Sequence, residues 1–504
     1  MKKAAVLFIA FCMLFCAACQ APEDNPSATA TASQNEGTSS PTAEGFMWEG
    51  KYAPLNGEKT PISLEAQSMD TAAPNVTFTI TDEATLTLEQ AMDAQFNYYT
   101  ITFKSSQPLW MYVGYEKDGE LYEELCFLEA GEEYLTFKSY IDGFMDGLSA
   151  SMLKSFRFSN RGEENANVEI TAIGTEQKPS IEKDVFLENE YIKIGADLVY
   201  GGALSYLEYI NEPVALVTMN DRAEVGINYA DLVDEEDVRS TSVNLLNNYD
   251  TGRLVQQSYY GINQAPYEPG EYMGREWNYN PVMGGDTYQN SSKIIDFEVT
   301  DTHIYVKCRP MDWAKDNVPT MSYMESTYTL DGRNLLVDNR FVDFSPYEHI
   351  QWNQELPAFY VIEPLYRLAY YPGRDVWNGE LTFRDNLPFW DGVWTSFTSR
   401  EHWWAWVNGA ENVEDSFGIG LYVPDVNTVM GGIFSEGGEV GDNPAKASPT
   451  CYIAALKAMT LIHFKPLEYS YAIACGSLND IRESFKELSE EGTMSNQSLL
   501  DYNK

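Results

Sequence analysis

Positively charged residues are scarce in this sequence. It contains 33 Lys and Arg against 76 Asp and Glu, which gives a formal net charge of −43. A chain with that charge repels the phosphate backbone of nucleic acids and the headgroups of anionic lipids, so nucleic-acid binding is not expected. Histidine is scarce too, with four residues. A zinc site built from histidines is therefore disfavoured.

Cysteines are few, and their spacing excludes the usual metal-binding patterns. Three of the seven fall near the N-terminus and four are scattered through the rest of the chain, at Cys126, Cys308, Cys451 and Cys475. Cys451 and Cys475 could pair across neighbouring strands, and buried free thiols explain them at least as well. The many acidic residues show no EF-hand-like spacing, so no motif supports bound calcium. We expect neither a metal nor a cofactor.

Long apolar runs are absent except at the N-terminus. Lys2 and Lys3 precede an apolar run, and the small residues Ala17 and Ala18 lead to Cys19. The run is too short to span a bilayer and has the ends of a processed signal peptide. The segment resembles the bacterial lipobox, in which the cysteine becomes the acylated first residue.

Cys16 stands where a lipobox usually has Leu, which leaves ordinary secretion as the alternative. We expect a signal peptide at 1–18 and a lipid on Cys19 that holds the protein on the extracellular face of the cell membrane. The lipid anchor would be its only membrane contact. Removal of Lys2 and Lys3 changes the net charge from −43 to −45.

The rest of the chain predicts an all-β protein of two domains. Residues 19–45 are rich in Ser, Thr, Ala, Asn and Pro and predict a disordered tether. Apolar and polar residues alternate in short segments of 46–180, which predicts a β-sandwich. A larger strand-rich domain follows at 181–490, and 491–504 is expected to be a flexible tail.

Two local patterns are clear in the larger domain. Asp331-Gly332 separates two strand-like segments, Tyr323–Leu330 and Asn334–Phe341, and predicts a hairpin with a type I′ turn. A short C-terminal helix is expected where Ile481, Phe485 and Leu488 fall on one face. Ser477 and Asp480 can cap the start of that helix.

Residues 244–261 bring many hydrogen-bonding side chains together with aromatic rings. Sugars need this mixture, because their hydroxyls bind amides and carboxylates while their C–H faces stack on rings. The candidate residues of this stretch are Asp250, Arg253, Gln256, Gln257, Tyr259 and Tyr260. A buried polar network, with Asp250 and Arg253 as a structural ion pair, explains the pattern nearly as well.

Two further stretches carry candidate acids and bases. Gly284 and Gly285 precede Asp286, which either faces a cleft or caps a tight loop. In the stretch 349–358, strand alternation would place four polar residues on one face, namely His349, Gln351, Asn353 and Glu355. His349 and Glu355 could then act as acid and base, although an exposed edge strand has the same pattern.

Tryptophans are concentrated between 377 and 406, where six of the eleven occur. An indole in contact with water commonly stacks on a saccharide ring, which makes Trp403 and Trp404 candidates for substrate binding. Core packing between sheets explains two or three of the six.

Together these stretches resemble the galactose mutarotase-like β-supersandwich proteins, which include aldose epimerases, glycoside hydrolases and domains of polysaccharide lyases. The resemblance covers about residues 185–489. It rests on Gly201–Leu204, Tyr249–Gln257, Gly284–Asp286, Gln354-Glu355, Trp403–Val423 and Cys475–Arg482. It implies a carbohydrate ligand on the concave face of a large sheet. In the epimerases a histidine and a glutamate exchange protons with the sugar, and Glu355 is the matching carboxylate.

No histidine matches the epimerase motif, and a tethered exported protein does not suit a metabolic epimerase. We therefore expect a carbohydrate-active lipoprotein that binds and cleaves a poly- or oligosaccharide. A hydrolase would use Glu355 with Asp286 or Asp250 as its carboxylate pair. A lyase would use Tyr259, Tyr260 or His349 as base and Arg253 to neutralise a uronate. The alternatives are a non-catalytic glycan-binding lipoprotein and, ranked lower, a transporter's solute-binding lipoprotein, whose usual βαβ alternation is absent.

Overall fold

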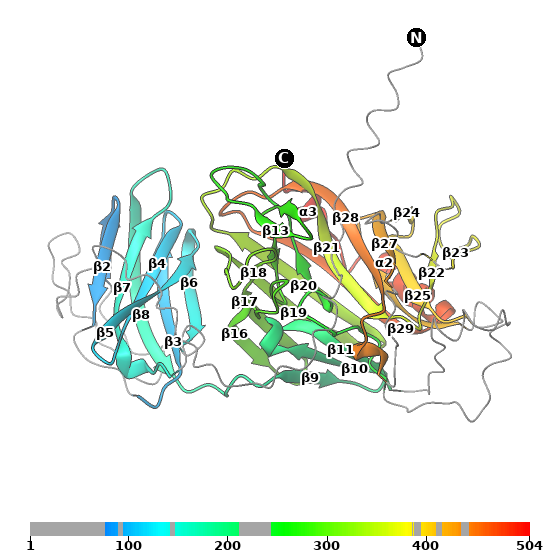
Figure 1. Cartoon of the computed structure of the whole chain (residues 1–504), viewed down its shortest axis with the longest axis horizontal. Helices are drawn as coiled ribbons and strands as arrows, with labels where there is room; N and C mark the ends of the chain where they lie inside the picture. The colour runs from blue at the N-terminus through cyan, green and yellow to red at the C-terminus, as the bar shows by residue number, and fades with distance from the viewer. Residues whose placement is uncertain are drawn as a thin grey trace, which may run out of the picture. The chain divides into compact units, whose positions relative to one another are not determined.

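The computed structural model describes residues 76–88, 94–141, 147–210, 243–385, 387, 395–409, 416–434 and 443–504. The expected signal peptide, Cys19 and the tether lie outside these residues. The chain divides into two compact units between Ile181 and Glu182 (Figure 1). Both are built from antiparallel strands, which confirms the all-β prediction.

The first unit is a sandwich of two four-stranded sheets, with strand orders β1-β8-β3-β6 and β2-β7-β4-β5. Aromatic side chains bridge the sheets: the Tyr99 and Phe156 rings lie 6.0 Å apart, and those of Phe78 and Phe158 lie 5.9 Å apart. The strands are β1 Val76–Ile80, β2 Glu83–Thr87, β3 Tyr98–Ser105, β4 Leu109–Lys117, β5 Glu120–Leu128, β6 Gly131–Tyr140, β7 Leu153–Asn160 and β8 Ala166–Glu176.

The second unit contains a ten-stranded sheet, in which β24-β27-β28-β21-β12-β11-β10-β9 form the main path and β15 and β18 branch from β12. Its strands are β9 Asp184–Glu188, β10 Ile192–Asp197, β11 Ala203–Tyr209, β12 Val255–Ser258, β15 Pro281–Val282, β18 Met311–Asp312, β21 Gln351–Ile362, β24 Thr395–Thr398, β27 Thr428–Phe434 and β28 Thr450–Thr460. A small separate hairpin joins β13 Gly270–Tyr272 and β14 Arg275–Trp277.

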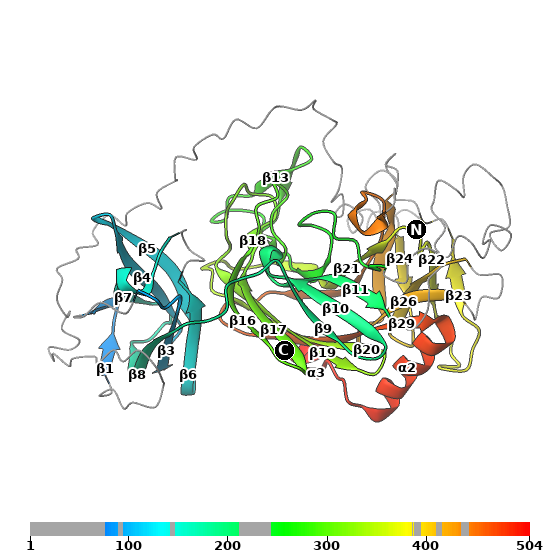
Figure 2. The ribbon, with the colours of Figure 1, turned by 90° about the horizontal axis from the view of Figure 1, so that it is seen from below.

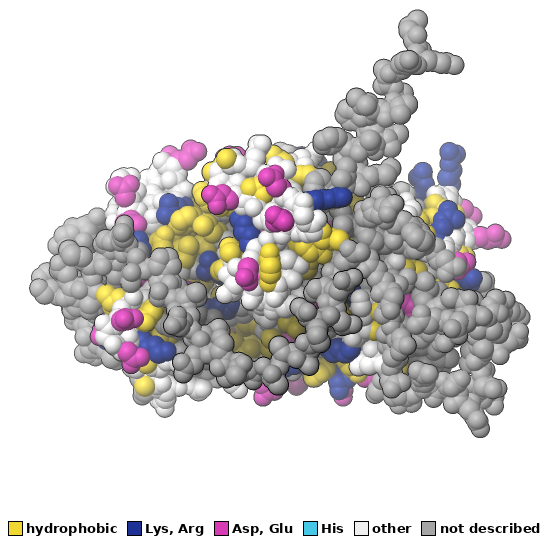
Figure 3. Space-filling view, viewed as in Figure 1, with side chains coloured by type: hydrophobic (Ala, Val, Ile, Leu, Met, Phe, Trp, Pro, Cys, Tyr) yellow, Lys and Arg dark blue, Asp and Glu magenta, His cyan; other side chains and the backbone are white. Residues whose placement is uncertain are grey.

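The other large sheet has nine strands in the order β16-β17-β19-β20-β29-β26-β25-β22-β23. Its strands are β16 Lys293–Val299, β17 His303–Arg309, β19 Ser322–Asp331, β20 Asn334–Asp343, β22 Arg367–Tyr370, β23 Thr382–Arg384, β25 Trp403–Val407, β26 Phe417–Tyr422 and β29 Leu467–Ser477. Acidic side chains are scattered over the face of the molecule shown in Figure 3.

The two large sheets are tied together by side chains from β12. Gln257 of β12 donates to Ser326 Oγ at 3.0 Å and to Asn339 Oδ1 at 3.1 Å, on strands β19 and β20 of the other sheet. Gly202 permits close approach of the sheets, because a Cβ there would lie 2.6 Å from Cβ of Val306. One face of β12 therefore belongs to the core, and its other face can carry a site.

The predicted hairpin is confirmed, but its turn is one residue further along the chain. Asp331 pairs with Asn334, so Gly332 and Arg333 are the two connecting residues. Only Gly332 of that pair has a positive φ, 56°. The prediction of Asp331-Gly332 as a type I′ pair is therefore wrong. The two strands and their antiparallel pairing are as predicted.

The predicted C-terminal helix is confirmed as α2, Leu478–Glu491, with Ser477 accepting a hydrogen bond from Asp480 N at 3.2 Å. It lies along β26 and β29 (Figure 2). Glu401 holds the helix to the sheet: its buried carboxylate accepts from Arg482 at 2.7 and 3.1 Å and from Trp403 Nε1 at 2.8 Å.

The segment 491–504, expected to be a flexible tail, contains a second helix, α3 Gln497–Asp501. Leu499 and Tyr502 are buried, and Asn503 exchanges two hydrogen bonds with the backbone of Thr460. These contacts attach the C-terminus to β28. The four described cysteines are buried and free, and Cys451 and Cys475 lie on different sheets. No described helix is long and apolar enough to cross a membrane.

Substitution Glu401→Ala is expected to lower the free energy of unfolding by about 3–5 kcal/mol, because it leaves buried donors without their acceptor. Urea unfolding of the purified chain measures the effect. Glu483→Ala on the same helix is the control: Glu483 pairs with Lys486 in solvent and should contribute at most about 1 kcal/mol. Equal losses in the two variants would contradict the assigned role of Glu401.

Asp197 gives the fold a pH dependence. Burial and the facing carboxylate of Asp184, its partner across β9 and β10, raise the pKa of Asp197 to about 6. The unfolded value is about 3.9, so the folded state takes up this proton first, and the free energy of unfolding rises as the pH falls from about 6 to 4.

Asp197→Asn keeps the acceptor for Val199 N and Tyr200 N and removes the charge. We expect the variant to be more stable than the wild type at pH 8 and to match it near pH 4. Urea unfolding at several pH values tests this. Parallel pH profiles for the two proteins would refute it, and Asp301→Asn at an exposed position should leave the profile unchanged.

Candidate functional site

A pocket opens on the face of the ten-stranded sheet that is turned away from the core. The volume of the pocket that is free of protein atoms is about 450 Å³, and this figure includes open solvent at its mouth. Five of its lining side chains are aromatic, one is a carboxylate and three are other polar groups. They are Tyr260, Trp277, Trp313, Tyr360 and Tyr452, then Glu355, then Gln256, Ser258 and Asn280.

Glu355 reaches this pocket because β21 contains an irregularity. Ser258 and Gln256, two residues apart on β12, pair with Glu355 and Ala358, three residues apart on β21. The extra residue places Glu355, Ala358 and Tyr360 on one face, which strict alternation would not do. Pro357 lies within the irregular segment, where its missing N–H interrupts no ladder hydrogen bond.

Tyr260 is the polar partner of Glu355. Its hydroxyl donates to Glu355 Oε1 at 3.1 Å. The side chain of Gln354 fixes its backbone, accepting from Tyr260 N at 2.7 Å and donating to Tyr260 O at 2.9 Å. Glu355 is 5% exposed, so the carboxylate sits in a largely dry environment with a phenol beside it.

Two indoles, Trp277 and Trp313, line one wall of the pocket, and both residues are hydrogen-bonded to Asn280. Trp277 Nε1 donates to Asn280 Oδ1 at 3.0 Å, and Asn280 N donates to Asp312 Oδ1 at 3.2 Å. Trp313 follows Asp312 directly and donates from its backbone N to Asn280 O at 2.9 Å. Burial raises the pKa of Asp312, against the opposing effect of Lys315.

The floor carries two stacked tyrosines. Tyr360 and Tyr452 pair across β21 and β28, and their ring centroids lie 4.3 Å apart with an angle of 29° between planes. The pocket therefore combines the flat faces of aromatic rings with one carboxylate.

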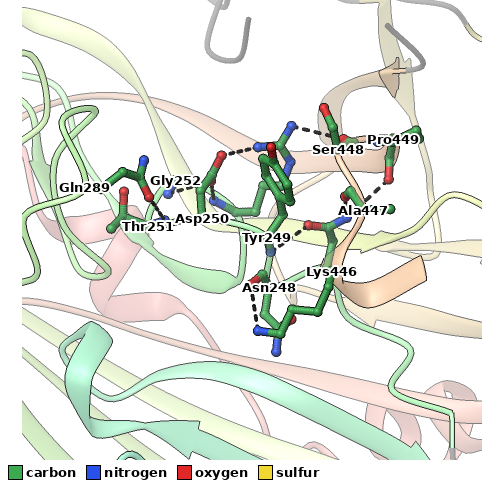
Figure 4. Close-up of polar contacts among 12 residues, drawn as sticks. Asn248, Tyr249, Asp250, Thr251, Gly252, Gln289, Lys446, Ala447, Ser448 and Pro449 are labelled. Atoms are coloured by element: carbon green, nitrogen blue, oxygen red, sulfur yellow. Dashed lines mark hydrogen bonds and ion pairs between the residues drawn. The ribbon is translucent and has the colours of Figure 1, made fainter. Parts of the chain in front are cut away.

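Asp250 and Arg253 lie beside this pocket and do not line it. Their side chains form an ion pair, and Arg253 Nη2 also donates to Ser448 O at 3.0 Å (Figure 4). Asp250 Oδ1 accepts from the backbone of Gly252 and Arg253, at 3.0 Å each. The pair shapes the turn whose Gly252 lines the pocket; a Cβ at Gly252 would lie 2.4 Å from the Trp313 ring.

Asp286 is occupied by its own loop. Its two carboxylate oxygens accept four hydrogen bonds of 2.8–2.9 Å, from the backbone of Tyr288, Asn290 and Asn317 and from the Asn290 side chain. The carboxylate is fully buried. It is not among the residues that line the pocket with Glu355.

His349 precedes β21 and its side chain is buried. Nε2 lies 3.0 Å from Asp343 Oδ2, and Nδ1 accepts from Ile262 N at 3.2 Å. The ring stacks on Tyr279 with centroids 5.1 Å apart. His349 therefore supports the loop after Tyr260 and is not among the residues that line the pocket with Glu355.

The other predicted binding residues divide between core, turn and surface. Gln256 lines the pocket, but its amide is bonded to the 251–253 turn and to Gly284 N. Gln257 and Tyr259 face the core between the sheets, and Gln351 is exposed at the start of β21. Trp403 and Trp404 are fully buried in β25. Trp390 and Trp394 lie outside the described residues.

Sequence reasoning did not single out Trp277, Trp313, Tyr360 or Tyr452 for the pocket. Trp277 lies nine residues before the candidate Asp286, and its spacing gave no sign of its own role. Tyr360 and Tyr452 sit in continuous apolar runs that indicate buried strands on both faces. Within the described residues, no group of three or more His, Cys, Asp or Glu could hold a metal ion.

Comparisons with known proteins concern the fold alone. No family model and no curated protein matches the sequence. Among solved structures, the chain is similar to a galactose mutarotase related enzyme from Lactobacillus acidophilus, at 11% identity and a TM-score of 0.33, over 59% of this chain and 99% of that one.

It is also similar to a galactose mutarotase-like protein from Lactobacillus casei, at 10% identity and a TM-score of 0.32, over 58% and 99% of the two chains. A GH36 alpha-galactosidase from Geobacillus stearothermophilus matches at 10% identity and a TM-score of 0.29, over 58% and 41%. The galactose mutarotase-like proteins named by the sequence resemblance are thus among the solved structures to which this chain is similar.

Proposed function

We propose that the pocket around Glu355 binds a saccharide and that Glu355 transfers a proton during its cleavage. The observation that carries the proposal is a carboxylate, 5% exposed, set among five aromatic side chains and three neutral polar ones. Aromatic faces match the C–H faces of sugar rings, and the polar groups match their hydroxyls. Aspartate and glutamate in such dry settings serve as acids and bases.

The composition of the pocket favours one type of cleavage. Hydrolysis with two carboxylates requires a second carboxyl group across the bond, and Glu355 is the carboxylate among the described lining residues. Elimination from a uronate needs one base and one acid. Glu355 can take the proton from the carbon beside the sugar carboxylate while Tyr260 supplies a proton to the leaving oxygen, and a carbon–carbon double bond forms.

A non-catalytic glycan-binding protein is the second candidate, favoured by the single carboxylate. It would use the same aromatic walls. For either function we further propose, from the N-terminal sequence, that the protein is exported and held on the outer face of the membrane by a lipid on Cys19.

Substitution Glu355→Gln removes the titrating group and keeps nearly the same shape. We expect release of products from a polysaccharide panel to fall at least about a hundredfold, because general acid–base catalysis supplies that much. Saccharide affinity should stay within a few-fold. Unsaturated products can be followed by their ultraviolet absorbance and other products by reducing ends.

Glu348→Gln, at an exposed position three residues before β21, should leave product release unchanged. Full activity in Glu355→Gln would refute the catalytic role. Saccharide binding without product release by the wild type would establish the glycan-binding alternative instead.

Substitution Trp313→Phe replaces one indole that lines the pocket with a smaller ring. We expect it to weaken saccharide binding about tenfold, which corresponds to about 1.4 kcal/mol. Isothermal titration calorimetry measures the change. Trp110→Phe in the first unit is the matched control, since the Cζ atom of Arg161 lies over that indole, 3.6 Å from the ring centroid. If both variants bind with the affinity of the wild type, Trp313 does not contact the ligand.

A further inference from the structure

A second hollow in the larger unit is lined by basic side chains. It encloses about 710 Å³ of space, open solvent included, and its lining residues are Arg374, Val376, Arg400, His402 and Asn427. Basic side chains are also prominent over the region of β22 to β24 in the space-filling view (Figure 3). The feature is unusual in a chain whose net charge is −43.

The two arginines are not neutralised within the part of the chain that the structure describes. None of the ion pairs there includes Arg374 or Arg400, although most other arginines of the unit have carboxylate partners. Neighbouring carboxylates are engaged elsewhere: Glu401 binds Arg482, and Asp425 accepts from Asn496 N at 3.0 Å. The described residues that line the hollow therefore include two positive charges and no carboxylate.

His402 adds a ring nitrogen to the same hollow. Its Nδ1 donates to Val426 O at 2.9 Å, which fixes the ring and leaves Nε2 for another partner. The residue has a φ of 60°, a strained value for a non-glycine residue, and such strain is often retained at binding sites. Two guanidinium groups and an amide suit an oxyanion such as a carboxylate or a sulfate ester, and the His402 ring can donate to the same anion from Nε2 in its protonated form.

The hollow borders the far end of a cross-strand row that starts at Glu355, because its lining residue Asn427 precedes Thr428 and Arg400 follows Thr398 by two residues. Glu355 pairs with Leu456 of β28, Val429 of β27 pairs with Ala455, and Thr428 pairs with Thr398 of β24. The row therefore runs from Glu355 through Leu456 and Thr428 to Thr398, two residues before Arg400. Three spacings between neighbouring strands separate Glu355 from Thr398 along this row, a distance of about 14 Å.

The row also belongs to one face. Residues paired across an antiparallel ladder point to the same side, so Leu456, Thr428 and Thr398 share the open face with Glu355. Thr398 is exposed, and Thr428 and Leu456 are half-buried. No described charged side chain occupies this row between Glu355 and Thr398.

We propose that Arg374, Arg400 and His402 form a subsite for the anionic group of an acidic oligosaccharide whose chain extends across the strands from the Glu355 pocket. This rests on the proposed function and adds the substrate class. The formal net charge of −43 repels an anionic chain from the protein as a whole, so a hollow lined by two arginines is a preferred place to hold it. A ligand of a single sugar ring is too short to reach both sites.

The test compares three oligosaccharides of equal length, one neutral, one carrying uronates and one carrying sulfate esters, with inorganic sulfate as a further probe. Binding to the wild type, to the Arg374→Gln/Arg400→Gln double variant and to Arg384→Gln is measured by calorimetry at low and moderate salt. Arg384 is an exposed arginine of β23 outside the hollow.

We expect the double variant to bind at least one acidic oligosaccharide about tenfold or more weakly than the wild type, and to bind the neutral one equally well. The wild-type affinity for the acidic ligand should fall with salt, since exposed charges are screened. Arg384→Gln should behave as the wild type. The arm that loses affinity identifies the anionic group as carboxylate or sulfate.

Unchanged binding of both acidic ligands in the double variant, or failure of the wild type to bind either, would overturn the subsite. Neutral oligosaccharide binding that still depends on Trp313 would then leave saccharide binding in the Glu355 pocket standing, without elimination from a uronate. Loss of acidic binding in the double variant, with no effect of Trp313→Phe on the binding of any ligand, would instead support the subsite and contradict saccharide binding in the Glu355 pocket. Binding of inorganic sulfate alone, without an acidic saccharide, would overturn the subsite as a saccharide site.

Discussion

The extra residue in β21 between Glu355 and Ala358 is the constraint on which the pocket depends. A regular strand would turn either the carboxylate or Ala358 and Tyr360 toward the core. The irregularity puts them on one face, next to Ser258 on β12 and Tyr452 on β28. Gln354, the residue before, then anchors Tyr260 against the carboxylate.

The two faces of β12 show how a packed core and a polar site coexist in neighbouring residues. Gln257 is used to tie the two large sheets together, and Gln256 is used to hold the turn that borders the pocket. Asp250, Arg253, Asp286 and His349 serve the same purpose around the pocket: each is hydrogen-bonded to backbone or to another buried side chain. Rigid support of this kind keeps the side chains that line the pocket in place.

The sequence was informative about the periodic and local features of the fold. Alternation identified the strands, Ser477 and the apolar stripe identified α2, and a glycine-containing turn identified the β19–β20 hairpin with a shift of one residue. The ion pair of Asp250 and Arg253 was one of two interpretations left open, and it is present. Burial of Trp403 and Trp404 follows from their place in β25, all five residues of which are buried, and the clustering of tryptophans could not reveal this.

The site was less predictable, because it is assembled from residues far apart in the chain. Glu355 was chosen for its polar neighbours. Gln351 and Asn353 share its face in the regular part of β21, as alternation predicts, but His349 lies before the strand and is bonded to Asp343. The irregular segment that brings Ala358 and Tyr360 to the face of Glu355 has no clear pattern beyond Pro357. Trp313, Tyr360 and Tyr452 meet only through strand pairing. Arg374 and Arg400 stand out only once the carboxylates near them are seen to be engaged.

A crystal structure of the Glu355→Gln variant with an oligosaccharide tests the central claim most directly. The account predicts a sugar ring between the indoles of Trp277 and Trp313 and the tyrosines of the floor, with the side chain at position 355 and the Tyr260 hydroxyl within hydrogen-bonding distance of it. An oligosaccharide bound elsewhere on the protein, with this pocket holding only water, would contradict it.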